Sequence, residues 1–308
     1  MLKFIGKRLL MLIPVVIGIS FIIFSIMSLT PGDPAQMKLG ESADPAAIEQ
    51  LREEMGLNDP FLVRYGTYMI NVLKGDFGKS YRTNLPVIEE IKTRFPVSLR
   101  MAFFGIGLSV VIGVPLGVLS AIKQYSILDI LSLSFALLLT AVPAFFLGLL
   151  LLLVFSLNLG WLPATGASTW LHYILPTITL GASATATITR LTRSNMLEII
   201  RQDYVRTAKA KGASQGKVIF KHVLRNAILP IVTVVGMNFG VQLGGTVVIE
   251  SVFSMPGMGS LMITAVRMKD IPVVTATVMF VAVAIGLANL VVDILYAYID
   301  PRIKSQYA

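Results

Sequence analysis

Long runs of uncharged, mainly apolar residues constrain the fold of this 308-residue chain more than any other feature. Four runs of 21 to 23 residues contain no Asp, Glu, Lys or Arg, at 9–29, 101–122, 227–249 and 271–292. A helix of about 20 apolar residues crosses the roughly 30 Å hydrocarbon core of a bilayer and satisfies its own backbone hydrogen bonds. With 55% hydrophobic residues, 14% charged residues and a mean hydropathy of +0.77, the chain has too little polar surface for a soluble globule. We therefore predict an all-α polytopic membrane protein.

A fifth uncharged stretch, 130–189, is 60 residues long and exceeds one membrane crossing. The Gly- and Pro-containing string GWLPATGAST at 160–169 divides it and predicts two helices, at about 130–156 and 172–192. The second of these is rich in small and hydroxyl residues, which favours packing against protein over contact with lipid. The prediction is six transmembrane helices, one ending near residue 29 and the others at about 100–122, 130–156, 172–192, 227–249 and 271–293.

The placement of Lys and Arg predicts the orientation of these helices. Basic residues flank the runs near the N-terminus, at Lys123, throughout 190–225 and near the C-terminus. Because cytoplasmic loops are enriched in Lys and Arg, both termini are predicted to be cytoplasmic, in the cytoplasmic (inner) membrane of a prokaryote. The segment 190–225 alone carries nine basic and two acidic residues, so its balance is 9 − 2 = +7 of a total of +9. Much of the net charge is thereby assigned to orientation, and we expect no nucleic-acid partner.

The first apolar run is predicted to be a retained membrane anchor. Its length of about 21 residues exceeds the about 7 to 15 residues of a signal-peptide core, and TPGDP follows it in place of a small-residue cleavage site. We expect 1–29 to form a cytoplasmic N-terminus and the first transmembrane helix.

The segment 30–94 is predicted to be extracytoplasmic. It contains two helix starts, Asp44 before Pro45 and Asp59 before Pro60, with stops at Gly56 and Gly75. Its ten acidic and eight basic residues between 31 and 94 nearly cancel. Two interpretations stay open here: a cap that connects two transmembrane helices, and a docking surface for an external partner.

Small residues recur at every fourth position in two of the apolar runs. Spacing of four places them on one helix face, where two backbones can approach closely. We expect these residues to pack helices together and to mark central helices, with a subunit interface as one role: Gly105, Gly113, Gly117, Gly236, Gly240 and Gly244.

Catalytic and metal-binding patterns are missing from the sequence. His172 and His222 are predicted on opposite sides of the membrane, and there is no cysteine. GDFGKS at 75–80 resembles the end of a phosphate-binding loop but has Leu73 where that loop needs its first Gly. The carboxylates Asp129, Glu250, Asp270 and Asp293 lie at helix ends, where they offer no proton path across the membrane. We expect no catalytic residue, no metal and no cofactor bound by this chain.

The string DYVRTAKAKG at 203–212, followed by NAILP at 226–230, resembles the EAA loop of ABC-importer permeases. That loop has the pattern E-A-A-x-x-x-G with I-x-L-P downstream. Aligned on Gly212, the chain has Arg206 in place of Glu, and Pro230 lies about five residues later than in the general pattern. Both departures are similar to the dipeptide/oligopeptide (peptide/nickel) branch of the family.

The resemblance to that branch covers nearly the whole chain. Further strings occur in the same order as in the branch: PGDP at 31–34, GDFGKS at 75–80, LGWLPATG at 159–166, TRSNMLEII at 192–200, ESVFSMPGMGSL at 250–261 and DILYAYIDPRIK at 293–304. They are less specific for the solute, since permeases for glutathione, nickel chelates and other small solutes share them.

The resemblance implies a type I ABC-importer core at 95–297, a coupling loop at 193–226 and a cytoplasmic tail at 298–308. It implies an importer of small peptides that works by alternating access, with membrane lipid around it. Its partners would be a second homologous permease, two cytoplasmic ABC ATPase subunits that bind ATP and Mg, and an extracytoplasmic solute-binding protein.

The resemblance also assigns roles to individual residues. A short coupling helix with a basic rim would dock on an ATPase. Apart from the resemblance, the Gly/Pro backbone of MPGMGSL at 255–261 predicts an external re-entrant or gating turn, with a surface turn without gating as the alternative. The coupling residues would be Asp203, Tyr204, Arg206, Thr207, Ala208, Lys209, Ala210, Lys211, Gly212 and Pro230, and the gate residues Pro256, Gly257 and Gly259.

Two other classes of function stay open at this point. A gradient-driven carrier or channel would act without partners, and a membrane enzyme would need a polar catalytic cluster near one interface. The missing mid-membrane carboxylates disfavour the first class, and the absence of a catalytic pattern disfavours the second.

Overall fold

A computed structural model describes residues 2–40 and 42–299, and over these residues the protein is built almost entirely from helices. Apart from one isolated β-bridge between Lys79 and Pro86, the described residues contain no β-structure. The α-helices are α1 (Leu2–Leu29), α2 (Pro34–Leu39), α3 (Pro45–Glu54), α4 (Phe61–Leu73), α5 (Val87–Ile122), α6 (Ile127–Ala141), α7 (Ala144–Leu151), α8 (Ile174–Ile200), α9 (Asp203–Ala210), α10 (Gln215–Lys217), α11 (Arg225–Val252), α12 (Met258–Arg267) and α13 (Ile271–Ile299). Two π-helical stretches, Leu152–Asn158 and Val218–Leu224, continue α7 and α10, and a 3-10 turn, Trp170–Tyr173, precedes α8.

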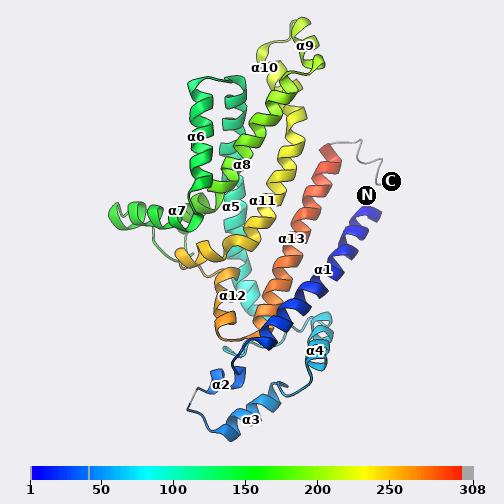
Figure 1. Cartoon of the computed structure of the whole chain (residues 1–308), viewed down its shortest axis with the longest axis vertical. Helices are drawn as coiled ribbons and strands as arrows, with labels where there is room; N and C mark the ends of the chain where they lie inside the picture. The colour runs from blue at the N-terminus through cyan, green and yellow to red at the C-terminus, as the bar shows by residue number, and fades with distance from the viewer. Residues whose placement is uncertain (1, 41, 300–308) are drawn as a thin grey trace.

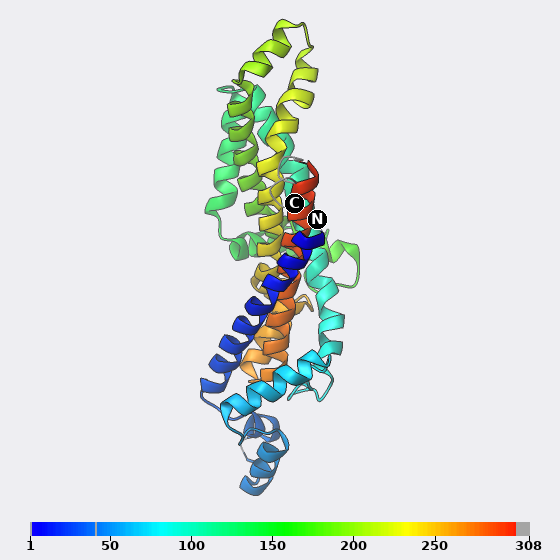
Figure 2. The ribbon, with the colours of Figure 1, turned by 90° about the vertical axis from the view of Figure 1, so that its right-hand side faces the viewer.

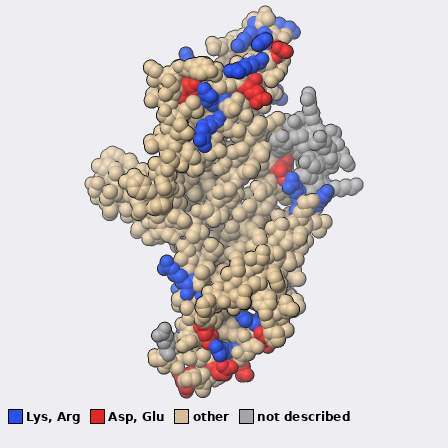
Figure 3. All heavy atoms as spheres, viewed as in Figure 1, with Lys and Arg blue, Asp and Glu red and all other residues tan. Residues whose placement is uncertain are grey.

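The long helices form an elongated bundle with a small helical group at each end. Figures 1 and 2 show α9 and α10 at one end, called the α9 end below, and α2 to α4 at the other, called the cap end. Helix α7 projects sideways from the bundle in Figure 1. In Figure 3, charged side chains gather mainly near these two ends, and most of the surface between them is uncharged. This distribution fits a bundle that crosses a membrane.

The most extensive helix packing joins α5 and α8. A Cβ atom added to Gly117 of α5 would lie 2.5 Å from Thr192 Cβ, and one added to Gly113 would lie 3.0 Å from Ile188 Cγ2. On the α8 side, a Cβ atom added to Gly181 would lie 2.8 Å from the Gly105 carbonyl oxygen of α5. Glycine is required at these crossings because a side chain would separate the two backbones.

The second part of the bundle is formed by α1, α11 and α13. Gly236 of α11 faces Val292 of α13, and Gly240 and Gly244 face Ile285 of the same helix. At the other face of α13, Asp293 forms an ion pair of 3.1 Å with Arg8 of α1. Asp293 therefore pairs with a neighbouring helix, as expected for a residue near a helix end.

Four helices are long and apolar enough to cross a membrane, and a bent pair formed by α6 with α7 and its π-helical extension brings the number to five. Helix α8 has 27 residues, enough for a crossing, but its small and hydroxyl residues keep it outside this apolar group. The fold is thus polytopic and helical, and the count of six crossings and the orientation of the termini stay predictions.

Several predicted boundaries are wrong. The single helix at 130–156 is broken after α6, and the chain turns by 100° before α7. The sequence Val142-Pro143 explains the break, because proline disfavours a helical conformation at the preceding residue. Helix α5 begins at Val87, inside the predicted segment 30–94, and α13 continues to Ile299, inside the predicted tail 298–308. Residues 300–308 of that tail lie outside the described residues.

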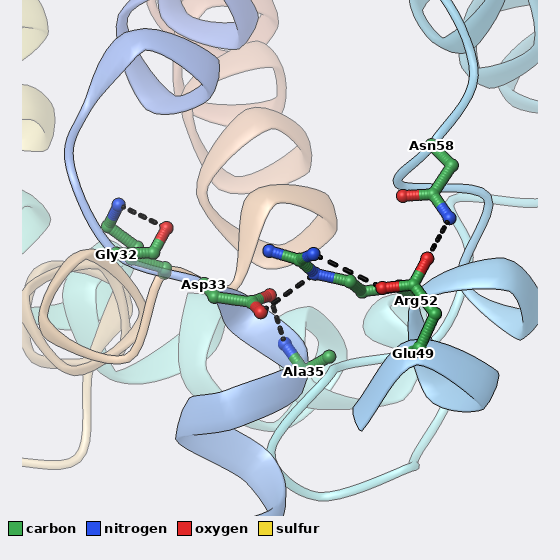
Figure 4. Close-up of polar contacts among 7 residues, drawn as sticks. Gly32, Asp33, Ala35, Glu49, Arg52 and Asn58 are labelled. Carbon is green, nitrogen blue, oxygen red and sulfur yellow. Dashed lines mark hydrogen bonds and ion pairs between the residues drawn. The ribbon is translucent and has the colours of Figure 1, made fainter. Parts of the chain in front are cut away.

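The cap end is held by helix caps and ion pairs (Figure 4). The Asp44 side chain accepts a hydrogen bond from the Ala46 N–H and caps α3, which confirms the predicted start. Asp59 does not cap α4, since Pro60 takes the N-cap position without a side-chain bond. Helix α2, capped by Asp33, was not predicted. In Figure 4, Arg52 of α3 reaches Asp33 at 2.9 Å and therefore joins α3 to the start of α2.

Candidate functional site

Helix α9 lies at the end of a hairpin that extends α8 and α11 beyond the rest of the bundle (Figure 1). Asp203 stands in its first turn and Lys209 in its last, the favourable placement for the helix dipole. The helix ends in a Schellman motif. Gly212 N–H bonds to Lys209 O at 2.9 Å, Ala213 N–H bonds to Ala208 O at 3.2 Å, and Gly212 has φ +79°. Gly212 therefore lies just after the end of this helix, in the left-handed conformation that glycine adopts easily.

One apolar face anchors α9 to the bundle. Val205 is fully buried in a cluster contributed by α5, α8, α9, the following π-helix and α11: Val118, Ala121, Met196, Val205, Val218, Val223 and Ala227. Ala208 is half-buried against the same cluster, so it faces the protein's own core and not the outside. Through this cluster α9 packs against α5, α8 and α11.

The opposite face of α9 is solvent-exposed and combines basic with aromatic side chains. Tyr204 is 45% exposed, and Arg206, Thr207, Ala210 and Lys211 are exposed as well. Phe220, in the π-helical stretch after α10, is 65% exposed. Exposed aromatic residues among Arg and Lys are typical of protein-binding surfaces.

A buried ion pair braces the base of this hairpin. Arg193 of α8 donates two hydrogen bonds to Asp129 of α6, at 2.7 and 2.8 Å. Asp129 also accepts from the Ser120 hydroxyl of α5 and, at 2.9 Å, from the Tyr125 N–H. Three helices are thus joined through one carboxylate.

The turn between α11 and α12 is folded tightly onto α11 near the cap end. Glu250 is fully buried; it accepts from the Ser98 hydroxyl at 2.6 Å and from the Ser260 N–H, in the first turn of α12, at 2.9 Å. Gly257 and Gly259 are buried, and a Cβ atom at either would collide with Glu250 or with the Val247 backbone. The carboxylate therefore stabilises the N-terminus of α12 and fixes the turn to α5 and α11.

Two adjacent residues after α12 hold the cap end in place. The buried Lys269 ammonium donates to the carbonyl oxygens of Thr30 and, at 2.9 Å, of Gly32, and burial lowers its pKa. Asp270 accepts from the Ser80 hydroxyl at 2.5 Å. Burial also raises the pKa of the Tyr81 phenol to about 12, although the nearby Arg64 opposes the shift. Among the described residues, no group of three His, Cys, Asp or Glu side chains lies close enough to hold a metal ion.

Comparisons with known proteins give the family. A model described as "Binding-protein-dependent transport system inner membrane component" matches residues 113–305, and one for the N-terminal part of such membrane components matches residues 1–102. The chain belongs to this family of ABC-importer permeases. It is 44% identical to the dipeptide transport system permease protein DppB of Alkalihalophilus pseudofirmus, over 99% of this chain and 100% of that protein. It is also 42% identical to the glutathione transport system permease protein GsiC of Pectobacterium atrosepticum, over 99% of both chains.

Solved structures agree on the fold of the permease. A chain of the MetNI methionine ABC transporter in an inward-facing form matches with a TM-score of 0.60 at 17% identity, over 69% of this chain and 97% of that chain. A chain of an amino acid ABC transporter matches with a TM-score of 0.52 at 15% identity. The family match, the bacterial relatives and the long apolar helices together show a multi-pass protein of a prokaryotic cell membrane, within the peptide branch of its family.

The permease brings most of the expected coupling residues together in α9 and its C-terminal turn. Pro230 is separate, since it lies within the first two turns of α11. Sequence reasoning missed Phe220 and Val205. Phe220 lies between Lys217 and Lys221. A large apolar residue among basic residues was the sequence pattern that could have indicated an exposed aromatic side chain. It also missed that Arg193, counted with the exposed basic cluster, is paired inside the bundle.

Proposed function

We propose that this permease imports small peptides, dipeptides or short oligopeptides, and that α9 couples transport to ATP hydrolysis by partner subunits. Two cytoplasmic ABC ATPases would bind ATP and Mg and dock on the exposed face of α9 and Phe220. A second homologous permease would complete the pathway, and an extracytoplasmic binding protein would deliver the solute at the cap end. In this proposal the α9 end and both termini are cytoplasmic.

The proposal is supported by the two different faces of α9, one buried in the bundle and one exposed. Val205 fixes the helix to the ends of α5, α8 and α11, while Tyr204 and the basic side chains are exposed on the other face. A partner that moves α9 therefore moves the long helices with it. ATP binding would bring the two ATPases together and switch the pathway between outward and inward access, and the solute acts only through its different affinities for these states. The turn at Pro256, Gly257 and Gly259 would close the external side.

The peptide assignment is supported by the relatives, one a dipeptide and one a glutathione permease. Glutathione is the second candidate solute on the same ground. The test is uptake by vesicles that contain the complete importer, with labelled dipeptide, oligopeptide and glutathione in competition. Peptide uptake that requires ATP and is not inhibited by glutathione supports the first candidate. Uptake of glutathione but of no other peptide would make glutathione the solute. Uptake by the permease without ATPase subunits would favour a gradient-driven carrier or channel.

A further inference from the structure

A polar cavity of about 260 Å³ lies beside the turn between α11 and α12, toward the cap end. Its walls come from three separate parts of the chain. Arg82 belongs to the loop before α5, Arg94 to α5 itself, and Ser254, Ser260 and Thr264 to the turn and to α12. Small-molecule pockets begin at about 300 Å³, so this volume accommodates one end of a peptide and not a long peptide.

The walls of this cavity are fixed by buried hydrogen bonds. Asp270 holds the loop that carries Arg82, through the Ser80 hydroxyl at 2.5 Å and the Arg82 N–H at 3.3 Å. Glu250 holds the opposite wall through Ser98 and Ser260. A preorganised wall of this kind loses little entropy when a ligand binds.

The two arginines face the cavity without a charge partner. Arg52 and Arg193 each bind a carboxylate, but neither Arg82 nor Arg94 forms an ion pair with any described residue. Glu250 also lines the cavity, yet its oxygens already accept from Ser98 and the Ser260 N–H. The cavity therefore presents two guanidinium groups that no described carboxylate neutralises, whereas the Ser260 and Thr264 hydroxyls already donate to backbone carbonyl oxygens. Guanidinium groups bind carboxylates through paired, charge-assisted hydrogen bonds.

We propose that this cavity is an entry site for the α-carboxylate of the incoming peptide, bound by Arg82 and Arg94. The proposal rests on the proposed import of peptides, and it names the group of the solute that is recognised. Dipeptides and glutathione share a free carboxylate, so one such site serves both kinds of solute named by the relatives. The ligand is held at the turn that carries the candidate gate residues, before it enters the pathway.

The experiment measures uptake kinetics in vesicles that contain the complete importer. Arg82→Gln with Arg94→Gln should raise KM for a free dipeptide at least about tenfold and leave kcat similar, because a ground-state contact is lost. The double Arg→Lys variant should recover part of this loss, and basal ATPase activity reports that each complex is assembled. The matched control is Arg100→Gln, an exposed arginine of α5 that does not line the cavity. It should leave KM unchanged.

A dipeptide with an amidated C-terminus separates the peptide carboxylate from other ligands. Wild type should take it up with a high KM that the Arg→Gln substitutions do not raise further. Equal losses for free and amidated peptides, together with weaker association of the binding protein, would overturn the proposal in favour of a carboxylate on that protein. If the double Arg→Gln variant keeps the wild-type KM for the free peptide, the entry site is contradicted and the proposed import of peptides is not. If wild type imports no peptide at all, the proposed function fails as well.

Discussion

The Ser80 hydroxyl donates a buried hydrogen bond of 2.5 Å to Asp270, a residue 190 positions later in the chain. Through this bond the loop before α5 is fixed to the start of α13, and the next bond of Asp270, to the Arg82 N–H, orients one wall of the cavity. The neighbouring Lys269 fixes the turn after α1 in the same way. Two consecutive side chains thus attach the cap end to the bundle.

Substitution of Ser80 by Ala should loosen the loop at 76–86. The buried Asp270 carboxylate loses its strongest donor, and a buried charged group with an unmade hydrogen bond is costly. Amide hydrogen exchange in this loop should accelerate, while exchange in α8 stays as in wild type. Lys79→Ala, at the exposed neighbouring position, is the control and should change neither rate. Unaltered exchange in the Ser80 variant would show that this contact does not hold the loop.

Gly117→Ala should destabilise the bundle. The added Cβ atom would lie 2.5 Å from Thr192 Cβ and 2.6 Å from Thr189 O, so α5 and α8 must separate. Overpacking of this kind costs about 1 to 3 kcal/mol. Gly107→Ala in the same helix is the matched control, because its added atom meets nothing within 4 Å. Thermal unfolding in detergent should give a lower Tm for the first variant only, and equal Tm values would contradict the packing described for α5 and α8.

Arg193→Gln or Asp129→Asn should each destabilise the base of the α9 hairpin. Removal of Arg193 leaves the buried Asp129 carboxylate without its counter-charge, at a cost of about 3 to 5 kcal/mol. Removal of Asp129 should cost less, because the Arg193 side chain is 20% exposed. The double variant should lose less than the sum of the two, since neither charge is then left alone. Arg206→Gln removes an exposed contact of 3.8 Å to Asp203 and should have little effect. The measurement is a double-mutant cycle on the free energy of unfolding. Strictly additive losses would show that the ion pair does not stabilise the fold.

The Tyr81 phenol should stay protonated at pH values where an exposed tyrosine ionises. Burial raises its pKa to about 12, so the folded state binds this proton more tightly than the unfolded state does. Its contribution to stability is present below pH 10 and is lost as the pH rises from about 10 to 12. The difference in absorbance at 295 nm between wild type and Tyr81→Phe should be small at pH 11. A full phenolate signal at that pH would show that Tyr81 is accessible to water.

The parts that sequence alone predicted depend on local chemistry. The helix cap at Asp44 and the close helix contact at Gly117 each follow from a residue and its immediate neighbours. The pair of Asp129 and Arg193, and the clamp of Lys269 on Gly32, join residues far apart in the chain, and periodicity carries no information about them. The break at Pro143 had a local signal, but the uncharged run around it favoured one continuous helix. The inward direction of Val205 and Ala208 depends on the packing of α9 against four other segments.

The most direct test of the coupling role of α9 uses the fact that the chain has no cysteine. A single Tyr204→Cys substitution places a photoactivated cross-linker on the exposed face of α9, and Lys74→Cys places the same reagent at the cap end as a control. In the assembled importer, the Tyr204 position should cross-link to an ATPase subunit and the Lys74 position should not. Cross-linking of Lys74 but not of Tyr204 to the ATPase would contradict both the docking site and the orientation proposed here.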